Sequence, residues 1–316
     1  IHLQDDSPRA TVKLPDRPKA PAMHAASRPP WQGYAAALGV VCIWTGFILI
    51  SRWGGKSPLT GYDVLALRLG AASLLLLPFC RDLPRTVWRE RRLWTLAAIG
   101  GVLYGVVVYT AFKYAPAAHG AILLPGMQPF LVTALLWLAL GERPTRSRLI
   151  GLAGIALGVL CVALPLLQAG DWRTLPGDAL MLVASLTWAV YSVLVRQWAF
   201  SPWVLTRFVA LGSALLYLPV YALWLPKGLA EASATQLITQ ALYQGIGPTI
   251  IAMWLFLLAV QQLGAARTGA LIGLVPVLAG LAAVPLLGEP LTASLLLGLC
   301  AVSAGAWYAA RPGRVA

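Results

Sequence analysis

The stretch Gly141-Glu142-Arg143-Pro144-Thr145 opens an apolar segment, and a similar stretch, Gly288-Glu289-Pro290-Leu291-Thr292, opens another near the C-terminus. Each is followed by two glycines seven residues apart: Gly151 and Gly158, then Gly298 and Gly305. The stretches align without a gap at a separation of 147 residues. A repeat at about half the length of a 316-residue chain predicts two copies of one structural unit.

The composition indicates a membrane protein. Hydrophobic residues make up 59% of the chain and charged residues 11%, whereas soluble domains contain about 25% charged residues. A fold with so little polar surface has to expose most of its surface to lipid. The net charge of +13 does not indicate nucleic-acid binding, because the charges lie in loops between apolar runs rather than on one face.

Ten apolar runs are long enough to cross a bilayer, which takes roughly 17–25 residues for about 30 Å of hydrocarbon. The first five are 34–51, 62–79, 94–112, 118–140 and 149–167. The second five are 179–196, 203–224, 237–259, 266–286 and 292–310. The run 237–259 gives the weakest signal, because Gln240, Gln244 and Thr249 interrupt it. We predict an all-α integral membrane protein with ten transmembrane helices.

The distribution of Lys and Arg predicts the orientation. With the N-terminus in the cytoplasm, seventeen of the 24 basic residues fall in cytoplasmic segments and five in outer loops. The positive-inside rule then places both termini in the cytoplasm of a bacterial-type inner membrane. Because each half has five spans, an odd number, the second half is inverted relative to the first. Inverted five-helix repeats are typical of transporters that bind substrate near the midplane.

A further set of residues recurs in both halves. The first half has Trp44, Arg68, Pro129 and Gly141-Glu142-Arg143, and the second has Trp188, Arg207, Pro276 and Gly288-Glu289-Pro290. This paired set resembles the EamA family of the drug/metabolite transporter superfamily over about residues 34–310. The resemblance implies two inverted repeats around a central cavity and, usually, export of amino acids or other small metabolites. The outer turn departs from the cytoplasmic one in having Pro290-Leu291 in place of Arg143-Pro144.

We divide the chain into a disordered N-terminal tail (1–30), a first repeat (31–168) and a second repeat (178–311). The tail is polar and rich in proline, a composition that cannot bury a core. Since residue 1 is not Met, Met23 is a candidate for the native start.

The charged residues of the repeats allow two interpretations each. Glu142 and Glu289 are interpreted as structural turn residues that complement the N-terminus of the following helix, worth a few tenths to about 1 kcal/mol; the alternative is a substrate or proton ligand. Arg68 and Arg207 lie inside spans, where a charge costs about 2.5–3.5 kcal/mol. They either snorkel to the interface or line the cavity and contact a substrate carboxylate.

Prolines and polar residues inside spans define the remaining candidates for the cavity. Pro125, Pro129, Gly247-Pro248 and Pro276 remove backbone donors, which is tolerated where a helix is buried in protein or lines a wet cavity. Packing kinks are the alternative. With Arg68 and Arg207, the predicted substrate-cavity residues are Tyr104, Gln128, Pro129, Trp188, Gln244 and Pro276; Tyr109 is a further candidate.

His119, the one histidine within the spans, is interpreted as an exposed residue at a helix end, with proton coupling as the alternative. The small residues Gly151, Gly154, Gly158, Gly298 and Gly305 predict close helix packing within the chain. Association of two copies through these faces, giving a homodimer, is the alternative.

The sequence shows no nucleotide-binding loop, metal-ligand cluster or catalytic constellation, so we expect no cofactor, no metal and no enzymatic activity. The prediction is an inner-membrane secondary transporter or facilitator that exports a small metabolite, amino-acid-like or drug-like, by alternating access. Its partners are the lipid bilayer and the small-molecule substrate. The alternatives are an integral membrane enzyme acting on lipid-linked substrates and a non-transporting membrane scaffold.

Overall fold

The computed structural model describes residues 30–169 and 172–310, and within these ranges every regular element is helical. The predicted tail, apart from Pro30, and Met23 lie outside the described residues, as do Arg311 and Arg314. In the described part of the chain, nine helical runs are long and apolar enough to span a membrane, and the apolar helix α15 (Ala293–Ala309) follows them. The prediction of an all-helical membrane protein with ten spans is confirmed.

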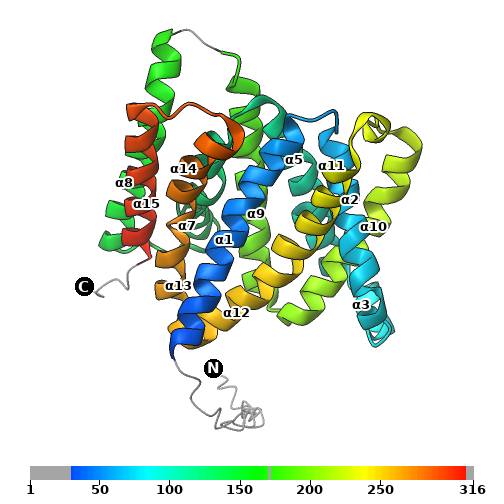
Figure 1. Ribbon diagram of the computed structural model, residues 1–316. Coiled ribbons are helices and arrows are strands. Elements are labelled where there is room, and N and C mark those ends of the chain that lie inside the picture. Colours follow the sequence, from blue (N-terminus) through cyan, green and yellow to red (C-terminus); the bar gives the residue numbers. More distant parts are fainter. Residues whose placement is uncertain (1–29, 170–171, 311–316) are drawn as a thin grey trace, which may run out of the picture.

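The first half contributes five spans and one short connecting helix (Figure 1). Its elements are α1 (Pro30–Gly55); α2 (Gly61–Leu76) with the 3₁₀ turn η1 (Leu77–Cys80); α3 (Arg85–Arg89); α4 (Arg91–Leu96), the π-helical η2 (Ala97–Leu103) and α5 (Tyr104–Tyr114); α6 (Ala117–Ala121), the π-helical η3 (Ile122–Gly126) and α7 (Gln128–Leu140); and α8 (Arg146–Ala169).

The second half repeats this order. Its elements are α9 (Leu175–Trp198); α10 (Pro202–Trp224); the 3₁₀ turn η4 (Leu229–Glu231); α11 (Ala234–Thr239), the π-helical η5 (Gln240–Gln244) and η6 (Gly247–Ile251), and α12 (Ala252–Leu263); α13 (Ala265–Ile272) and α14 (Val275–Leu287); and α15. The run predicted at 237–259 is the longest of the spans, Ala234–Leu263.

The four prolines singled out in the sequence divide into two groups. Pro125 and Pro248 lie in the π-helical segments η3 and η6, where the backbone leaves regular α-helical hydrogen bonding. Pro129 and Pro276 instead occupy the first turn of α7 and α14. A proline at that position removes no intrahelical bond. These two therefore start a helix segment rather than break one.

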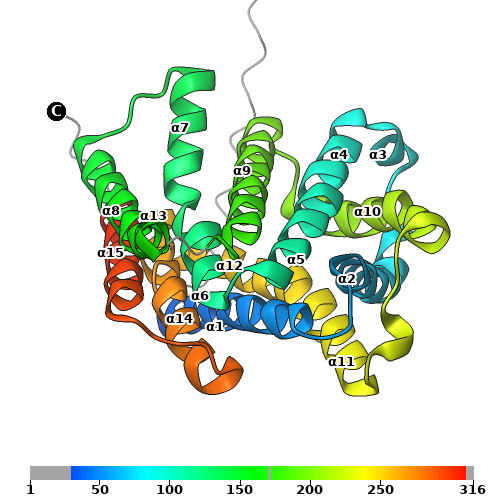
Figure 2. The same cartoon turned by 90° about the horizontal axis from the view of Figure 1, so that it is seen from above.

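The contacts between helices are related by exchange of the two halves. α1 packs against α12 and α14, and correspondingly α9 packs against α5 and α7. α2 pairs with α10, and α8 pairs with α15 (Figure 2). α1 begins and α15 ends at the end that we call lower, which is the bottom of Figure 1. The α14–α15 turn lies at the opposite, upper end, so the duplicated turns face opposite ways, as expected for an inverted repeat.

The duplicated turns have the same backbone conformation. Gly141 and Gly288 follow α7 and α14 with φ of 68° and 64°, the left-handed region that glycine adopts without strain. The amides of Gly141 and Gly288 donate to the carbonyls of Trp137 and Val284, four residues back, which is the αL cap of a helix C-terminus. This explains why both copies have glycine at this position.

The α8–α15 contact brings two backbones together. A Cβ added to Gly305 would lie 2.6 Å from the Gly151 carbonyl oxygen, and one added to Gly158 would lie 2.7 Å from the Gly298 oxygen. Exchange of the halves converts one glycine pair into the other. The predicted close packing within the chain is confirmed, and this face is therefore not free to form the alternative homodimer contact.

Gly305→Ala should destabilise the protein by about 1–3 kcal/mol, because the methyl group has only backbone to displace. Gly70→Ala in α2 is the matched control, since nothing lies within 4 Å of its added Cβ; it should be neutral or stabilising by up to about 1 kcal/mol. Unfolding of both variants in one detergent measures the difference. Equal stabilities would contradict the close contact.

Candidate functional site

Arg68 lies inside the helix bundle, seven residues or about 10 Å beyond the start of α2. Its Nε donates to Thr249 Oγ1 at 3.1 Å, and its Nη1 donates to the Tyr109 hydroxyl at 3.0 Å. Both partners are neutral hydroxyls. The ion pairs found among the described residues do not include Arg68, so the guanidinium has no carboxylate to neutralise it there.

The partners of Arg68 continue into a chain of hydrogen bonds. The Tyr109 hydroxyl donates to Gln244 Oε1 at 3.3 Å, and Gln244 Nε2 donates to Ser51 Oγ at 3.0 Å. Thr249 Oγ1 donates to the carbonyl of Gln244 at 2.9 Å. We call Arg68, Tyr109, Gln244, Ser51 and Thr249 the Arg68 cluster. It joins spans one, two and three of the first half to span eight of the second.

The π-helical course of span eight helps to place this cluster. Gln244 ends η5 and Thr249 lies in η6. Gln244 and Thr249, two of the three polar residues that weakened the prediction of this span, are therefore hydrogen-bond partners of Tyr109 and Arg68. Gln240, the third, donates to the carbonyl of Ile50 on α1 at 2.8 Å.

Aromatic side chains from both halves lie beside the Arg68 cluster. Tyr104 and Trp188 have ring centroids 4.9 Å apart, and Trp188 and Tyr191 have centroids 5.1 Å apart. Tyr104 and Tyr191 lie within electrostatic range of Arg68. Tyr104, Trp188 and Arg68 are only partly buried, so the structure brings these three predicted residues to one partly accessible region.

Two other predicted cavity residues, Gln128 and Arg207, contact other parts of the chain. Gln128 Nε2 donates to the carbonyl and hydroxyl oxygens of Ser185 at 3.0 Å each, which ties α7 to α9. Arg207 donates from Nη1 to the Phe79 carbonyl at 2.6 Å and lies 5.1 Å from the Trp203 ring centroid. Arg207 thus holds the end of η1 against the start of α10, and the structure does not bring it to Arg68.

The duplicated glutamates form ion pairs across the halves. Glu289 Oε1 lies 2.8 Å from Arg52 Nε, and Glu142 Oε1 lies 2.9 Å from Arg196 Nη2. The side chains that cap the following helices are Thr145, which accepts from the amide of Arg148, and Thr292, which accepts from that of Leu295. The carboxylates of the two glutamates are therefore directed to arginines and not to the first-turn amides of those helices, and their role as structural turn residues stays a prediction.

The arginine partners were missed, although the sequence contains a signal for them. Arg52 follows Trp44 by eight residues, and Arg196 follows Trp188 by eight residues. Trp44 and Trp188 are 144 residues apart, and so are Arg52 and Arg196. Only the fold shows that each arginine meets the glutamate of the opposite half.

Two further polar residues at the upper end were misjudged or missed. His119 is 9% exposed and its Nδ1 lies 2.9 Å from Asp178 Oδ1, so the expectation of an exposed histidine is wrong. Asp63 is fully buried and accepts hydrogen bonds from Thr60, Gly228 and Tyr221. Thr60-x-x-Asp63 is a capping box, a pattern that is readable in the sequence.

Two grooves in the described part of the chain lie away from the Arg68 cluster. One, of about 450 Å³, is lined by residues of α1 and span eight, including Tyr243 and Gly247. The other, of about 710 Å³, lies between α2 and α10 and is lined mainly by apolar side chains. Across residues 30–169 and 172–310 no group of three or more potential metal ligands occurs.

The family model of the EamA-like transporter family matches residues 31–164 and again 175–311. The chain belongs to the EamA-like transporter family. The two matches cover the two five-span halves, in agreement with the duplication. EamA-like proteins are transporters, and this chain is accordingly a multi-pass membrane protein with the fold of a small-molecule transporter.

Curated relatives of this EamA-like chain agree with the assignment. It is 30% identical over 264 residues to the threonine/homoserine exporter RhtA of Salmonella typhimurium (strain SL1344), covering 78% of this chain and 81% of the relative. It is 31% identical over 254 residues to RhtA of Escherichia coli (strain K12), with the same coverage. A solved crystal structure, described only as that of a protein, has a TM-score of 0.59 at 21% identity over 89% of this chain and 98% of its own. That likeness supports the fold.

Asp63→Asn should lower the free energy of unfolding by about 2–3 kcal/mol, because hydrogen bonds to a buried carboxylate are worth about 1.5–3 kcal/mol each. The exposed Asp82, in the turn that follows the same span, provides the control Asp82→Asn, which should change stability by less than about 0.5 kcal/mol. Thermal unfolding in detergent compares them. Similar losses in both variants would contradict the role given to Asp63.

Proposed function

We propose that this chain exports a small amino-acid-like metabolite and that Arg68 binds the carboxylate of the substrate. The observation that carries the proposal is a guanidinium inside the bundle whose hydrogen-bond partners are the neutral hydroxyls of Tyr109 and Thr249. An arginine in a membrane span is costly and is typically paired or functional. A substrate carboxylate supplies the missing negative charge.

The geometry of Arg68 suits a carboxylate. The guanidinium has five N–H donors arranged in a fork that matches a carboxylate in two-point contact. Nε and Nη1 are directed to the two hydroxyls, which leaves other donors for a ligand. Tyr104, Trp188 and Tyr191 provide aromatic faces nearby, on which the ammonium group of a zwitterion can rest.

The relatives support the same class of substrate. RhtA of both organisms is described as an exporter of threonine and homoserine, which are small hydroxylated amino acids. The Tyr109 and Thr249 hydroxyls lie against Arg68. They could form hydrogen bonds with the hydroxyl group of such a substrate. This makes a small zwitterionic amino acid the substrate that we favour.

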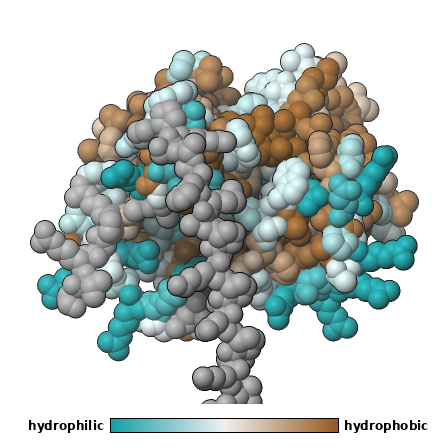
Figure 3. Space-filling view, turned by 90° about the horizontal axis from the view of Figure 1, so that it is seen from below, coloured by the Kyte–Doolittle hydropathy of each residue, from teal (hydrophilic) through white to brown (hydrophobic). Residues whose placement is uncertain are grey.

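The orientation that serves export has both termini in the cytoplasm. Seventeen basic residues then lie in cytoplasmic segments, and the lower end of the molecule carries α3 and the start of α8 (Figure 1). Seen from this end, hydrophilic side chains gather on both sides of the molecule (Figure 3). The halves, placed at residues 31–168 and 178–311, would open this end or the upper end in turn.

Proteoliposomes containing the purified protein should show saturable transport of labelled threonine or homoserine, inhibited by related amino acids and not by the corresponding amines. Arg68→Gln should reduce this transport at least about tenfold, the equivalent of 1.4 kcal/mol. Arg68→Lys should recover only part of it, because lysine keeps the charge and loses the fork.

Arg207→Gln is the matched control, an arginine in the corresponding span of the other half whose hydrogen bonds go to backbone carbonyls. It should lower stability and leave the KM of transport unchanged. Two results would refute the proposal: no saturable flux of any amino acid by folded protein, or equal KM values for Arg68→Gln and the unaltered chain.

A further inference from the structure

Two ion pairs of the same composition lie at opposite ends of the molecule. Arg52 at the end of α1 pairs with Glu289 after α14, and Arg196 at the end of α9 pairs with Glu142 after α7. Exchange of the halves converts one pair into the other. We propose that these pairs are alternating gates of the transport cycle, each sealing its own end of the bundle in one of two mirror-related states.

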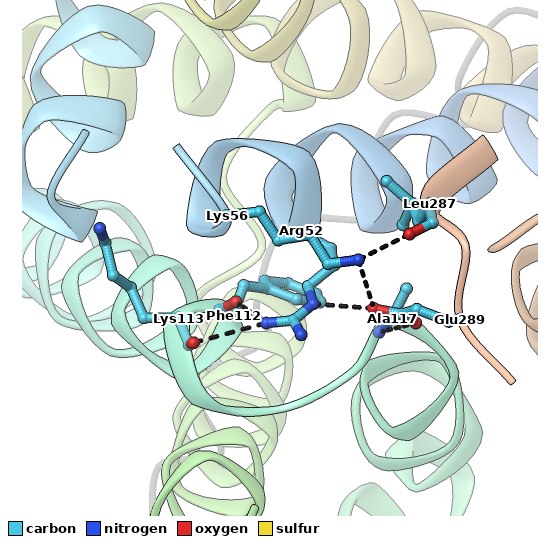
Figure 4. A network of polar contacts seen from close by, with 7 residues as sticks. All are labelled: Arg52, Lys56, Phe112, Lys113, Ala117, Leu287 and Glu289. Carbon is cyan, nitrogen blue, oxygen red and sulfur yellow. Dashed lines mark hydrogen bonds and ion pairs between the residues drawn. The ribbon is translucent and has the colours of Figure 1, made fainter. Parts of the chain in front are cut away.

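The upper pair is part of a closed latch (Figure 4). Arg52 Nη1 also donates to the Phe112 carbonyl at 2.7 Å, and Glu289 Oε2 accepts from the Ala117 amide at 2.8 Å. Lys56 donates to the Leu287 carbonyl at 2.6 Å. The latch therefore fastens the ends of α1, α5 and α14 to the start of α6, all at the upper end.

The lower pair has the same charges in a different environment. The side chains of Arg196 and Glu142 are 58% and 44% exposed, whereas those of Arg52 and Glu289 are 14% and 7% exposed. Arg196 contacts both carboxylate oxygens of Glu142, at 2.9 and 3.2 Å. An exposed pair of this kind contributes little to stability, while a buried and multiply bonded one is costly to break.

Equivalent residues in unequal environments describe one state of a two-state molecule. In this state both ion pairs are formed, the upper one buried and the lower one exposed, and we take the upper end to be the sealed one. In the mirrored state the environments exchange: Arg196 and Glu142 become buried, and Glu142 meets the start of α13 as Glu289 now meets the start of α6. The two gates cannot both take the buried form if the path is to open at either end.

This inference rests on the proposed transport function, but its test measures accessibility and requires no flux. The reporter is Thr249→Cys, beside Arg68, in a background in which Cys42, Cys80, Cys161 and Cys300 are replaced by alanine. A membrane-impermeant maleimide is added to one side or the other of oriented vesicles. Labelling from the side of the Glu289 turn reports opening of the upper end.

Glu289→Gln and Arg52→Gln should each increase labelling from the Glu289 side, on the order of tenfold, because they weaken the sealed state. Glu142→Gln and Arg196→Gln should decrease it, because they weaken the mirrored state that opens the upper end. Glu231→Gln, an exposed glutamate near the upper end, should leave labelling unchanged.

Opposite shifts distinguish gates from structural ion pairs, which would move all four variants in one direction or none. Variants of the buried pair are compared after gel filtration shows folded protein. If they do not fold, the exposed pair decides alone: labelling unchanged or increased by Glu142→Gln would overturn the proposal. If the variants show opposite shifts and the unaltered chain transports no amino acid, the gates are retained and the substrate is rejected.

Discussion

The backbone contact between α8 and α15 fixes the relation of the two halves. Glycine pairs at Gly151–Gly305 and Gly158–Gly298 bring carbonyl oxygens to positions that any Cβ would occupy. In lipid, helices gain no hydrophobic attraction for one another, so close packing of small residues supplies the association. With this contact in place the halves are antiparallel copies, and the two Gly-Glu turns lie at opposite ends.

The inverted arrangement explains why each glutamate finds its arginine in the other half. Arg52 and Glu289 are 237 residues apart in the chain and 2.8 Å apart in the fold. The two ion pairs occupy equivalent positions in the two repeats. In the conformation of this structure one pair is buried and the other is exposed. Arg207, which occupies the corresponding span of the other half, does not contact Arg68, because it donates to the Phe79 carbonyl in η1 instead. One central cation in a symmetric frame fits a single substrate site reached from two sides.

Much of the fold could be predicted from the sequence because the bilayer limits the choices. Apolar runs of sufficient length have to be helices, the repeat gives their grouping, and Gly141 and Gly288 mark equivalent turns. The π-helical segments could not be predicted, since η2 contains no proline and hydropathy does not depend on the hydrogen-bond pattern. Pro129 and Pro276 were misjudged because the sequence does not show whether a proline lies within a helix segment or begins one.

Some of the residues proposed for the site could be picked out from the sequence. Arg68, Gln244, Tyr104 and Trp188 were identified by their polarity or aromatic character inside spans, and the structure brings them to one region. The roles of Arg52, Arg196, Asp63 and His119 depend on partners from distant parts of the chain, which residue type and spacing alone do not specify. Glu142 and Glu289 were recognised as a repeated feature, but their arginine partners were not.

The most direct test of alternation is to measure two distances between spin labels by double electron–electron resonance. One pair of labels at Pro58 and Leu291 reports the upper end, and one at Arg143 and Gln197 reports the lower end; all four positions are exposed. Addition of threonine should shift the two distance distributions in opposite directions. The upper distance should lengthen and the lower one should shorten. Distances that change together, or that do not change although threonine is transported, would contradict the account.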